Sequence, residues 1–140
     1  MKKKLVLISF MTAFAAGLIM ESCKKNGKPS NPIVGKWKMT AYIHEGMNVF
    51  GTGQLDPCYV DNIITFTSGP EVIVDEGATK CSPSDPQTFS GTYSLNSDNT
   101  QLTVSSNGSS DVDYIRTLNS TTLKVEQISN GDLITYTRVP

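Results

Sequence analysis

The chain of 140 residues contains a single histidine, His44, and no nucleophile motif beside it. An active site needs a nucleophile with a base, a set of metal ligands or paired carboxylates in a cleft. His44 stands in a predicted loop, so we expect its side chain to be solvated. The acidic residues show no calcium-loop spacing. The sequence therefore predicts no enzyme, no catalytic residue, no metal site and no cofactor.

Basic residues are scarce in the part of the chain that we expect to fold. From Ile33 to Pro140 there are six lysines and arginines against twelve aspartates and glutamates, a net charge near −6. Nucleic acids are held by clustered lysines and arginines. This charge excludes nucleic acid as a partner.

The only long apolar run extends from Leu5 to Met20 and follows the basic start MKKK. A membrane-spanning helix needs roughly 20 apolar residues, whereas this run is shorter and is interrupted by Ser9 and Thr12. A basic start, a short apolar centre and small residues at the cleavage point are typical of an export signal. We therefore expect residues 1–22 to be a signal peptide.

This signal ends in Ser22-Cys23 and resembles a lipoprotein signal, in which the cysteine is acylated and becomes the first mature residue. An ordinary secretory signal with a stray cysteine is the alternative. Residues 23–32 comprise Cys23 and a tether rich in Pro, Gly and Lys, which reaches about 30 Å when extended. The signal resembles those of Bacteroidota lipoproteins. In these lipoproteins, an acidic cluster after the cysteine is associated with export to the cell surface. The lysines found here favour a lipid anchor in the outer membrane, facing the periplasm.

Residues 33–140 show no helical periodicity of useful length and are expected to form one domain. Short alternating segments, separated by turn residues at regular intervals, indicate an all-β sandwich or barrel. Eight hairpin-connected strands favour a small antiparallel up-and-down barrel, because closure removes exposed strand edges. The expected strands are 35–43, 62–67, 71–76, 88–96, 101–106, 111–118, 122–128 and 133–139.

The turns between these segments predict the register of three hairpins. Two of them, closed by residues 68–70 and 98–99, bring large apolar residues opposite each other: Phe66 with Val72, Ile64 with Val74, Leu95 with Leu102, and Tyr93 with Val104. In the third, Asn130-Gly131 is a strong signal for a two-residue turn, since both residues tolerate positive φ. That turn pairs Val125 with Tyr136 and Leu123 with Arg138.

The only tryptophan is expected to form the floor of the barrel. Alternation along the first strand directs Trp37, Met39, Ala41 and Ile43 inward, and Lys36, Lys38, Thr40 and Tyr42 outward. The third hairpin directs Arg138 inward, and closure of the barrel sets the last strand beside the first. The guanidinium of Arg138 would then lie over Trp37, an attraction of about 0.5–2 kcal/mol. The alternative is that Arg138 frays into solvent with the chain end.

Two of the three cysteines are predicted to form a disulfide. If the register that pairs Phe66 with Val72 continues just past the strand ends, Cys58 and Cys81 come nearly opposite each other. An exported protein matures in an oxidising compartment, and Cys23 is expected to carry lipid.

Together these motifs resemble a known family, the small lipocalin-like domain of Bacteroidota lipoproteins. They are GKW at 35–37, CYVDN at 58–62, ITF at 64–66, EGATKC at 76–81, GTYSLN at 91–96 and the arginine Arg138 in the last strand. The chain is shorter than larger lipocalins and lacks their Thr-Asp-Tyr loop motif. The resemblance implies a lipocalin-like barrel that binds a small apolar molecule, without a roomy ligand cup.

Long loops gather at one end of the expected barrel, and function tends to collect on loops held by a rigid scaffold. Loop 44–61 is apolar enough to act as a ligand lid or as a plug of the barrel. An acidic rim is expected there, formed by Asp56, Asp61, Asp75, Glu76 and Asp85. The candidate ligand-binding residues are Met39, Met47, Phe50, Phe66, Tyr93 and Tyr136.

Two functions remain open from the sequence. One is a binding module for a small apolar molecule. The other is a filled barrel that meets a periplasmic protein and holds no ligand. The geometry of an eight-stranded barrel allows both, because its interior is filled by side chains or by one small ligand.

Overall fold

A computed structural model describes residues 31–140. The predicted signal peptide 1–22, the lipid-bearing Cys23 and nearly all of the tether 23–32 lie outside the described residues. Among the described residues, no helix is long and apolar enough to cross a membrane.

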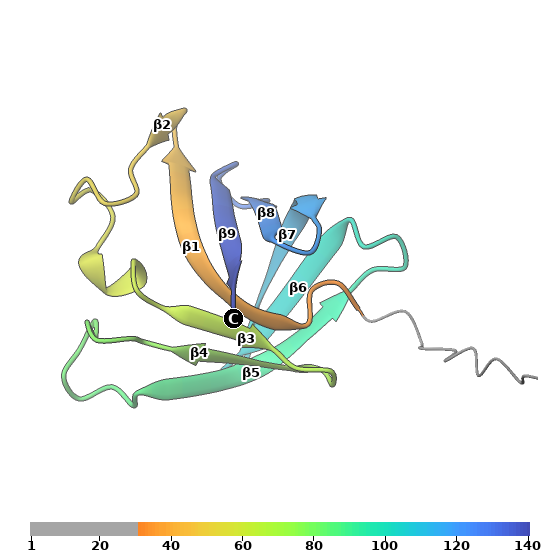
Figure 1. Cartoon of the computed structure of the whole chain (residues 1–140), viewed down its shortest axis with the longest axis horizontal. Helices are drawn as coiled ribbons and strands as arrows, with labels where there is room; N and C mark the ends of the chain where they lie inside the picture. Colours follow the sequence, from red (N-terminus) through yellow and green to blue (C-terminus); the bar gives the residue numbers. More distant parts are fainter. Residues whose placement is uncertain (1–30) are drawn as a thin grey trace, which may run out of the picture.

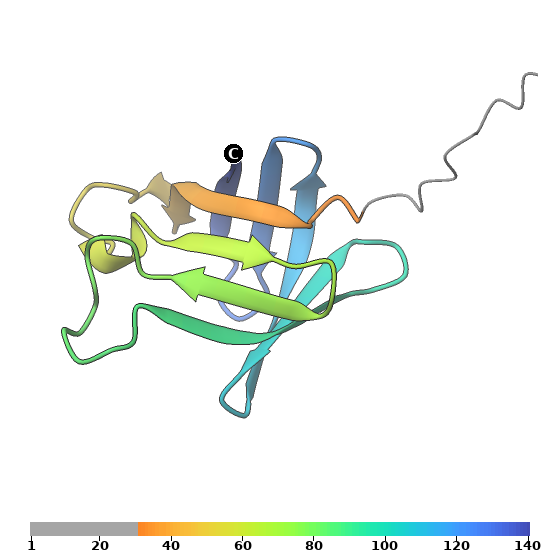
Figure 2. The same cartoon turned by 60° about the horizontal axis from the view of Figure 1, so that its bottom comes forward.

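The described chain is an all-β, closed, eight-stranded antiparallel barrel, as the sequence predicts (Figure 1). The eight barrel strands pair in chain order, and β1 (Gly35–His44) closes the barrel by pairing with both β3 (Ile63–Phe66) and β9 (Leu133–Val139). In Figure 2, β1, β3, β4 and β5 lie side by side while β7, β8 and β9 run across them. The strands are β1 (Gly35–His44), β3 (Ile63–Phe66), β4 (Glu71–Asp75), β5 (Thr88–Leu95), β6 (Gln101–Ser106), β7 (Ser109–Leu118), β8 (Thr122–Gln127) and β9 (Leu133–Val139), with a two-residue β2 (Met47–Asn48) beside β1.

The two hairpins with short turns have the predicted register. In β3–β4, Phe66 faces Val72 and Ile64 faces Val74. In β5–β6, Tyr93 faces Val104 and Leu95 faces Leu102.

The predicted register of the third hairpin is wrong by two residues. Leu123 faces Tyr136 and Val125 faces Ile134, because the chain turns through a longer loop than Asn130-Gly131 alone. The loop is closed by the Gln127 amide donating to the Asp132 carbonyl. A slip of two residues preserves the inward face, since side chains alternate with a period of two.

The predicted alternation of β1 holds only for its first half. The ladder to β9 slips between Met39 and Ala41, so one extra residue is inserted into the strand. Such a bulge reverses the alternation beyond it. Tyr42 therefore packs against the core, in place of the predicted Ala41 and Ile43.

Most of the buried core lies toward the end of the barrel where tight turns join the strands. Phe66 and Tyr93 pack edge to face, with ring centres 4.9 Å apart, and the Tyr93 hydroxyl donates to the Thr67 carbonyl at 2.7 Å. Phe89 is 41% exposed, because it is the second residue of β5 and lies at the long-loop end. The buried cluster comprises Ile33, Trp37, Phe66, Val72, Tyr93, Leu102, Leu123, Val125 and Ile134.

The two long loops are tied to each other at the opposite end. Cys58, in the single 3-10 turn η1 (Pro57–Tyr59), is bonded to Cys81 in the loop between β4 and β5, which confirms the predicted disulfide. The Asp61 carboxylate reinforces the link by accepting from the Ala78 and Thr79 amides at 2.8 and 3.0 Å.

Candidate functional site: the barrel interior

Arg138 and Trp37 close the floor of the barrel. The guanidinium carbon lies 4.3 Å from the centre of the indole. Its three nitrogens donate to the carbonyls of Val34, Pro32 and Ser120 at 2.6 to 2.7 Å. Arg138 therefore joins the entering chain, the turn between β7 and β8, and the last strand.

The entering chain seals the floor from below. Ile33 is fully buried, and its carbonyl accepts from the indole nitrogen of Trp37 at 2.7 Å. Gly35 has a φ of +140°, and a Cβ at this position would collide with the Arg138 guanidinium. Only glycine allows the chain to pass this close to the arginine.

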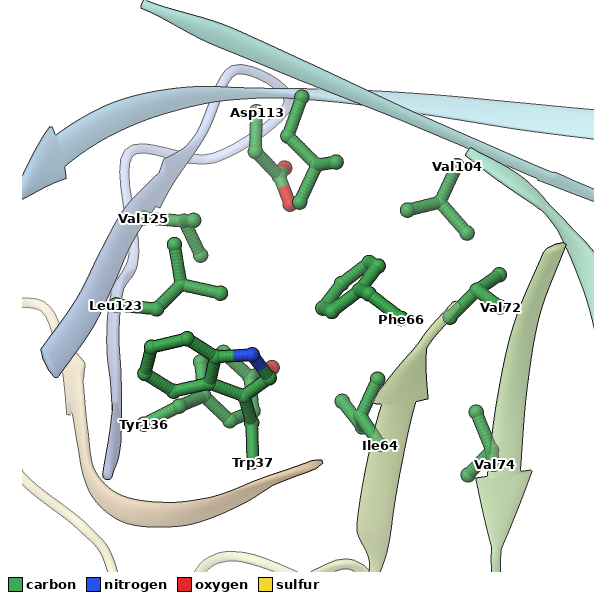
Figure 3. Close-up of a pocket in the computed structure, with 11 residues that line it drawn as sticks. Trp37, Ile64, Phe66, Val72, Val74, Val104, Asp113, Leu123, Val125 and Tyr136 are labelled. Atoms are coloured by element: carbon green, nitrogen blue, oxygen red, sulfur yellow. The ribbon is translucent and has the colours of Figure 1, made fainter. Parts of the chain in front are cut away.

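A cavity of about 100 Å³ lies inside the barrel above Trp37 (Figure 3). Its wall is apolar except for the Asp113 carboxylate, the Tyr136 hydroxyl and the indole nitrogen. The residues that line it are Trp37, Ile64, Phe66, Val72, Val74, Leu102, Val104, Asp113, Leu123, Val125 and Tyr136.

Asp113 places a carboxylate on this inner wall. It faces Leu102 on β6 and Gln127 on β8, so the register of β7 directs it inward, and Figure 3 shows its side chain pointing into the cavity. No hydrogen bond joins it to another residue of the described chain. Burial, and then the charge of Asp111, raise the pKa of Asp113 to about 6. Asp113 is thus a mostly ionised group at neutral pH without a protein partner.

Tyr136 lies at the boundary between the inner cavity and the mouth of the barrel. It also lines a groove at the long-loop end, together with Met39, Tyr42, Leu55, Tyr59, Gln127 and Ile134. Burial raises the pKa of the Tyr136 phenol, and the charge of Asp113 adds to this effect. The phenol stays protonated and can donate or accept a hydrogen bond.

A hydrogen-bonded cluster at the mouth centres on Asp132, which is only 3% exposed. Its carboxylate accepts from the Tyr42 hydroxyl at 2.6 Å and from Asn130 at 2.9 Å, and it pairs with His44 Nδ1 at 2.9 Å. His44 is exposed, as predicted, but it does not lie in a loop: it is the last residue of β1, and its ring also binds Asp132.

The cluster shifts the pKa values of its members in opposite directions. The hydrogen bond to Asp132 raises the pKa of His44 and raises that of Tyr42 to about 12. Burial pushes the pKa of Asp132 upward, but the hydrogen bonds from Tyr42, His44 and Asn130 outweigh it and hold the value below its usual range.

The predicted ligand-binding residues separate into four groups. Phe66 and Tyr136 line the inner cavity, and Met39 lines the mouth groove. Tyr93 packs beneath Phe66. Met47 is 58% exposed, and neither it nor Phe50 lines the cavity or the groove.

Loop 44–61 is partly a plug. Val49 is buried, and Leu55 lines the mouth groove.

The predicted solvated acidic rim is wrong for several of its members. Asp75 accepts from the Gly77 amide and from Gln87, Asp61 binds the adjoining loop, and Glu76 is 6% exposed. Within residues 31–140, no group of three or more His, Cys, Asp or Glu side chains could hold a metal ion.

Asp113 and Asp132 are the site residues that the sequence analysis missed. For Asp113 a signal was available, because the turn at Asn107-Gly108 sets it opposite Leu102, which the predicted register already pairs with the apolar Leu95. Asp132 had no local signal, since its partners Tyr42 and His44 lie on the first strand.

Comparisons with known proteins agree with this architecture. A family model described as a lipocalin-like domain matches residues 33–125. A lipocalin-like protein from Bacteroides uniformis is structurally similar with a TM-score of 0.54 at 15% identity, covering 77% of this chain and 99% of that one. An uncharacterized protein from Bacteroides eggerthii has a TM-score of 0.53 at 12% identity, covering 76% and 99%. These two similarities show the fold alone. No curated protein matches the sequence.

Proposed function

Because the chain belongs to the family of lipocalin-like domains, we propose that it is a binding protein that holds a small, largely apolar molecule inside its barrel. The observation that carries this proposal is the cavity above Trp37, whose wall is almost entirely apolar. A concave apolar site with a few convergent polar groups is the usual form of a small-molecule site. The volume of about 100 Å³ sets a tight upper limit on the ligand.

The proposal includes a lipid anchor at Cys23 in the outer membrane, with the barrel in the periplasm. It is supported by the basic start, the apolar run and the Ser22-Cys23 pair. The Cys58–Cys81 disulfide fits an oxidising compartment. Mass spectrometry of the membrane-extracted protein should find a lipid on Cys23, whereas a soluble form with an unmodified Cys23 contradicts the anchor.

The second candidate is a barrel that serves a periplasmic protein partner and holds no ligand. The small volume of the cavity favours it, because about 100 Å³ corresponds to only a few water molecules at ~30 Å³ each. The two candidates differ in what the purified protein carries.

The deciding experiment is native mass spectrometry, with solvent extraction, of protein purified from its own host. A reproducible small molecule in stoichiometric amount supports the binding module. Protein that carries none, and that takes up none of a panel of small apolar probes, contradicts it and favours the partner-binding candidate.

A further inference from the structure

We propose that the ligand of the barrel is a small protonated amine, whose ammonium group pairs with the Asp113 carboxylate inside the cavity. This inference rests on the proposed function, binding inside the barrel, and narrows the ligand to a cation with a short apolar body.

The first observation is that Asp113 lacks a counter-charge. A charged group in apolar surroundings is costly unless it is paired or hydrogen-bonded. None of the lysines or arginines of residues 31–140 lines the cavity. Arg116 is held by Glu126 at 2.7 Å, Lys80 by the Asp85 carbonyl, and Arg138 by three carbonyls at the floor. A cation supplied by a ligand would complete the site.

The second observation is the aromatic lining. The rings of Trp37, Phe66 and Tyr136 border the same cavity as Asp113. Aromatic rings attract ammonium groups and are used in cages that recognise alkylated amines. The Tyr136 hydroxyl, which has no partner among the described residues, adds a hydrogen-bond acceptor for an ammonium group. Carboxylate, rings and phenol thus favour the same head group.

The size and charge of the cavity exclude other classes of ligand. A cavity of ~150 Å³ holds benzene, so this smaller one admits a body of about four carbon atoms. A carboxylic acid small enough to be enclosed in this cavity would bring its carboxylate near that of Asp113, and like charges in an apolar site repel each other strongly. The site therefore selects amines against acids of the same shape.

The pH dependence follows from the groups that face Asp113. Its own strand contributes Asp111, and β9 contributes Tyr136. β3, β4, β6 and β8 contribute no titratable group to the cavity wall. The pKa of Asp113 is raised to about 6 by burial and then by Asp111. An alkylamine remains protonated up to a pH of about 10, so its binding should strengthen as the pH rises through 6.

The test uses three probes that share a four-carbon body: n-butylammonium, n-butanol and n-butyrate. Trp37 is the only tryptophan of the chain and borders the cavity, so its fluorescence reports occupancy of the full-length protein. Above pH 7, we expect n-butylammonium to bind about tenfold or more tightly than n-butanol, as a charge-assisted hydrogen bond provides. We expect n-butyrate to bind least, and the preference for the amine to fade as the pH falls below about 5.

Two variants test whether the preference for the amine arises at Asp113. Asp113→Asn keeps the shape of the side chain and should abolish the preference for the amine while n-butanol still binds. Glu71→Gln removes an exposed carboxylate of β4 that does not line the cavity, and it should leave the preference intact.

The remaining outcomes overturn the amine proposal. If the parent binds n-butylammonium and n-butanol equally, or if the preference survives in Asp113→Asn, the amine proposal fails and apolar binding stands. Loss of the preference in Glu71→Gln would assign it to surface charge. If no probe binds, the amine proposal fails as well, and the host extraction decides separately whether the barrel holds any ligand.

Discussion

Arg138 and Trp37 are paired residues of β9 and β1, and the guanidinium carbon of Arg138 lies 4.3 Å from the centre of the Trp37 indole. This contact forms at the seam where the last strand meets the first. The same guanidinium donates hydrogen bonds to the carbonyls of Pro32 and Val34. Arg138 of the last strand therefore fixes the segment that enters the first strand. The contact between Arg138 and Trp37 therefore both forms the floor of the barrel and lies at its closing seam.

The substitution Arg138→Ala should destabilise the barrel by about 2–4 kcal/mol. It removes the attraction to the indole, worth ~0.5–2 kcal/mol. It also leaves three carbonyls without their charged donor. Hydrogen bonds to a charged group are worth ~1.5–3 kcal/mol each, and water replaces part of this loss. Urea unfolding followed by Trp37 fluorescence measures the loss. Lys36→Ala, at an exposed position of β1, serves as the control and should change the free energy of unfolding by less than about 0.5 kcal/mol. An Arg138→Ala variant as stable as the control contradicts the role of the pair.

The sequence predicts most where local turn chemistry decides the structure. The loop Ser68–Pro70 and the turn Asp98–Asn99 are short, so they fix the register of their hairpins and, through it, the approach of Cys58 to Cys81. Trp37 and Arg138 are neighbours although the predicted register of the last hairpin was wrong, because a slip of two residues keeps the same face inward.

The bulge in β1 and the longer loop before β9 were not predictable from the residues nearby. The bulge after Met39 lets β1 bend between its neighbours β3 and β9, and no residue of β1 itself predicts it. It turns Tyr42 inward, and there Tyr42 meets Asp132. Asp132 in turn holds its loop in a longer form than Asn130-Gly131 alone predicts. The two segments whose structure was wrongly predicted, β1 and the last hairpin, thus meet in one contact, the hydrogen bond from Tyr42 to Asp132.

The disulfide should contribute about 3 kcal/mol to the free energy of unfolding. Closing a loop with a sequence separation of 23 residues restricts the unfolded chain by roughly that amount. Urea unfolding with and without a reductant measures it. The double variant Cys58→Ala, Cys81→Ala should match the reduced protein and no longer respond to the reductant. A parent protein whose midpoint is unchanged by reduction contradicts the prediction.

The pair of His44 and Asp132 should make stability depend on pH in two windows. The hydrogen bond to Asp132 raises the pKa of His44 above its usual 6.5, so this contribution is complete below pH 6.5 and is lost as the pH rises through the folded value. The pKa of Asp132 lies below its usual 3.8, so its contribution is present above that pH and is lost in more acidic solution.

The pair is therefore most stabilising between about pH 4 and 6.5. As His44 is the only histidine of the chain, its imidazole NMR signals titrate without overlap. We expect a midpoint above 6.5 in the parent and a return toward 6.5 in Asp132→Asn. An unshifted midpoint in the parent shows that the contact does not persist in solution.

Asp113→Asn should stabilise the unliganded barrel at neutral pH, the opposite of what removing a paired carboxylate does. Burial raises the pKa of Asp113 from 3.8 to about 6. Ionising this carboxyl group therefore costs free energy in the folded protein but not in the unfolded chain. The penalty is absent below pH 4, grows as the pH rises to about 6 and is constant above it. After allowance for water that reaches the carboxylate, the gain in Asp113→Asn is about 1–2 kcal/mol above pH 6. Urea unfolding at pH 4 and at pH 8 measures it, with Glu71→Gln as the control that changes little at either pH. A variant that is less stable than the parent at pH 8 would mean that Asp113 already has a partner in the free protein, and the cavity would then have no charge left to offer an amine.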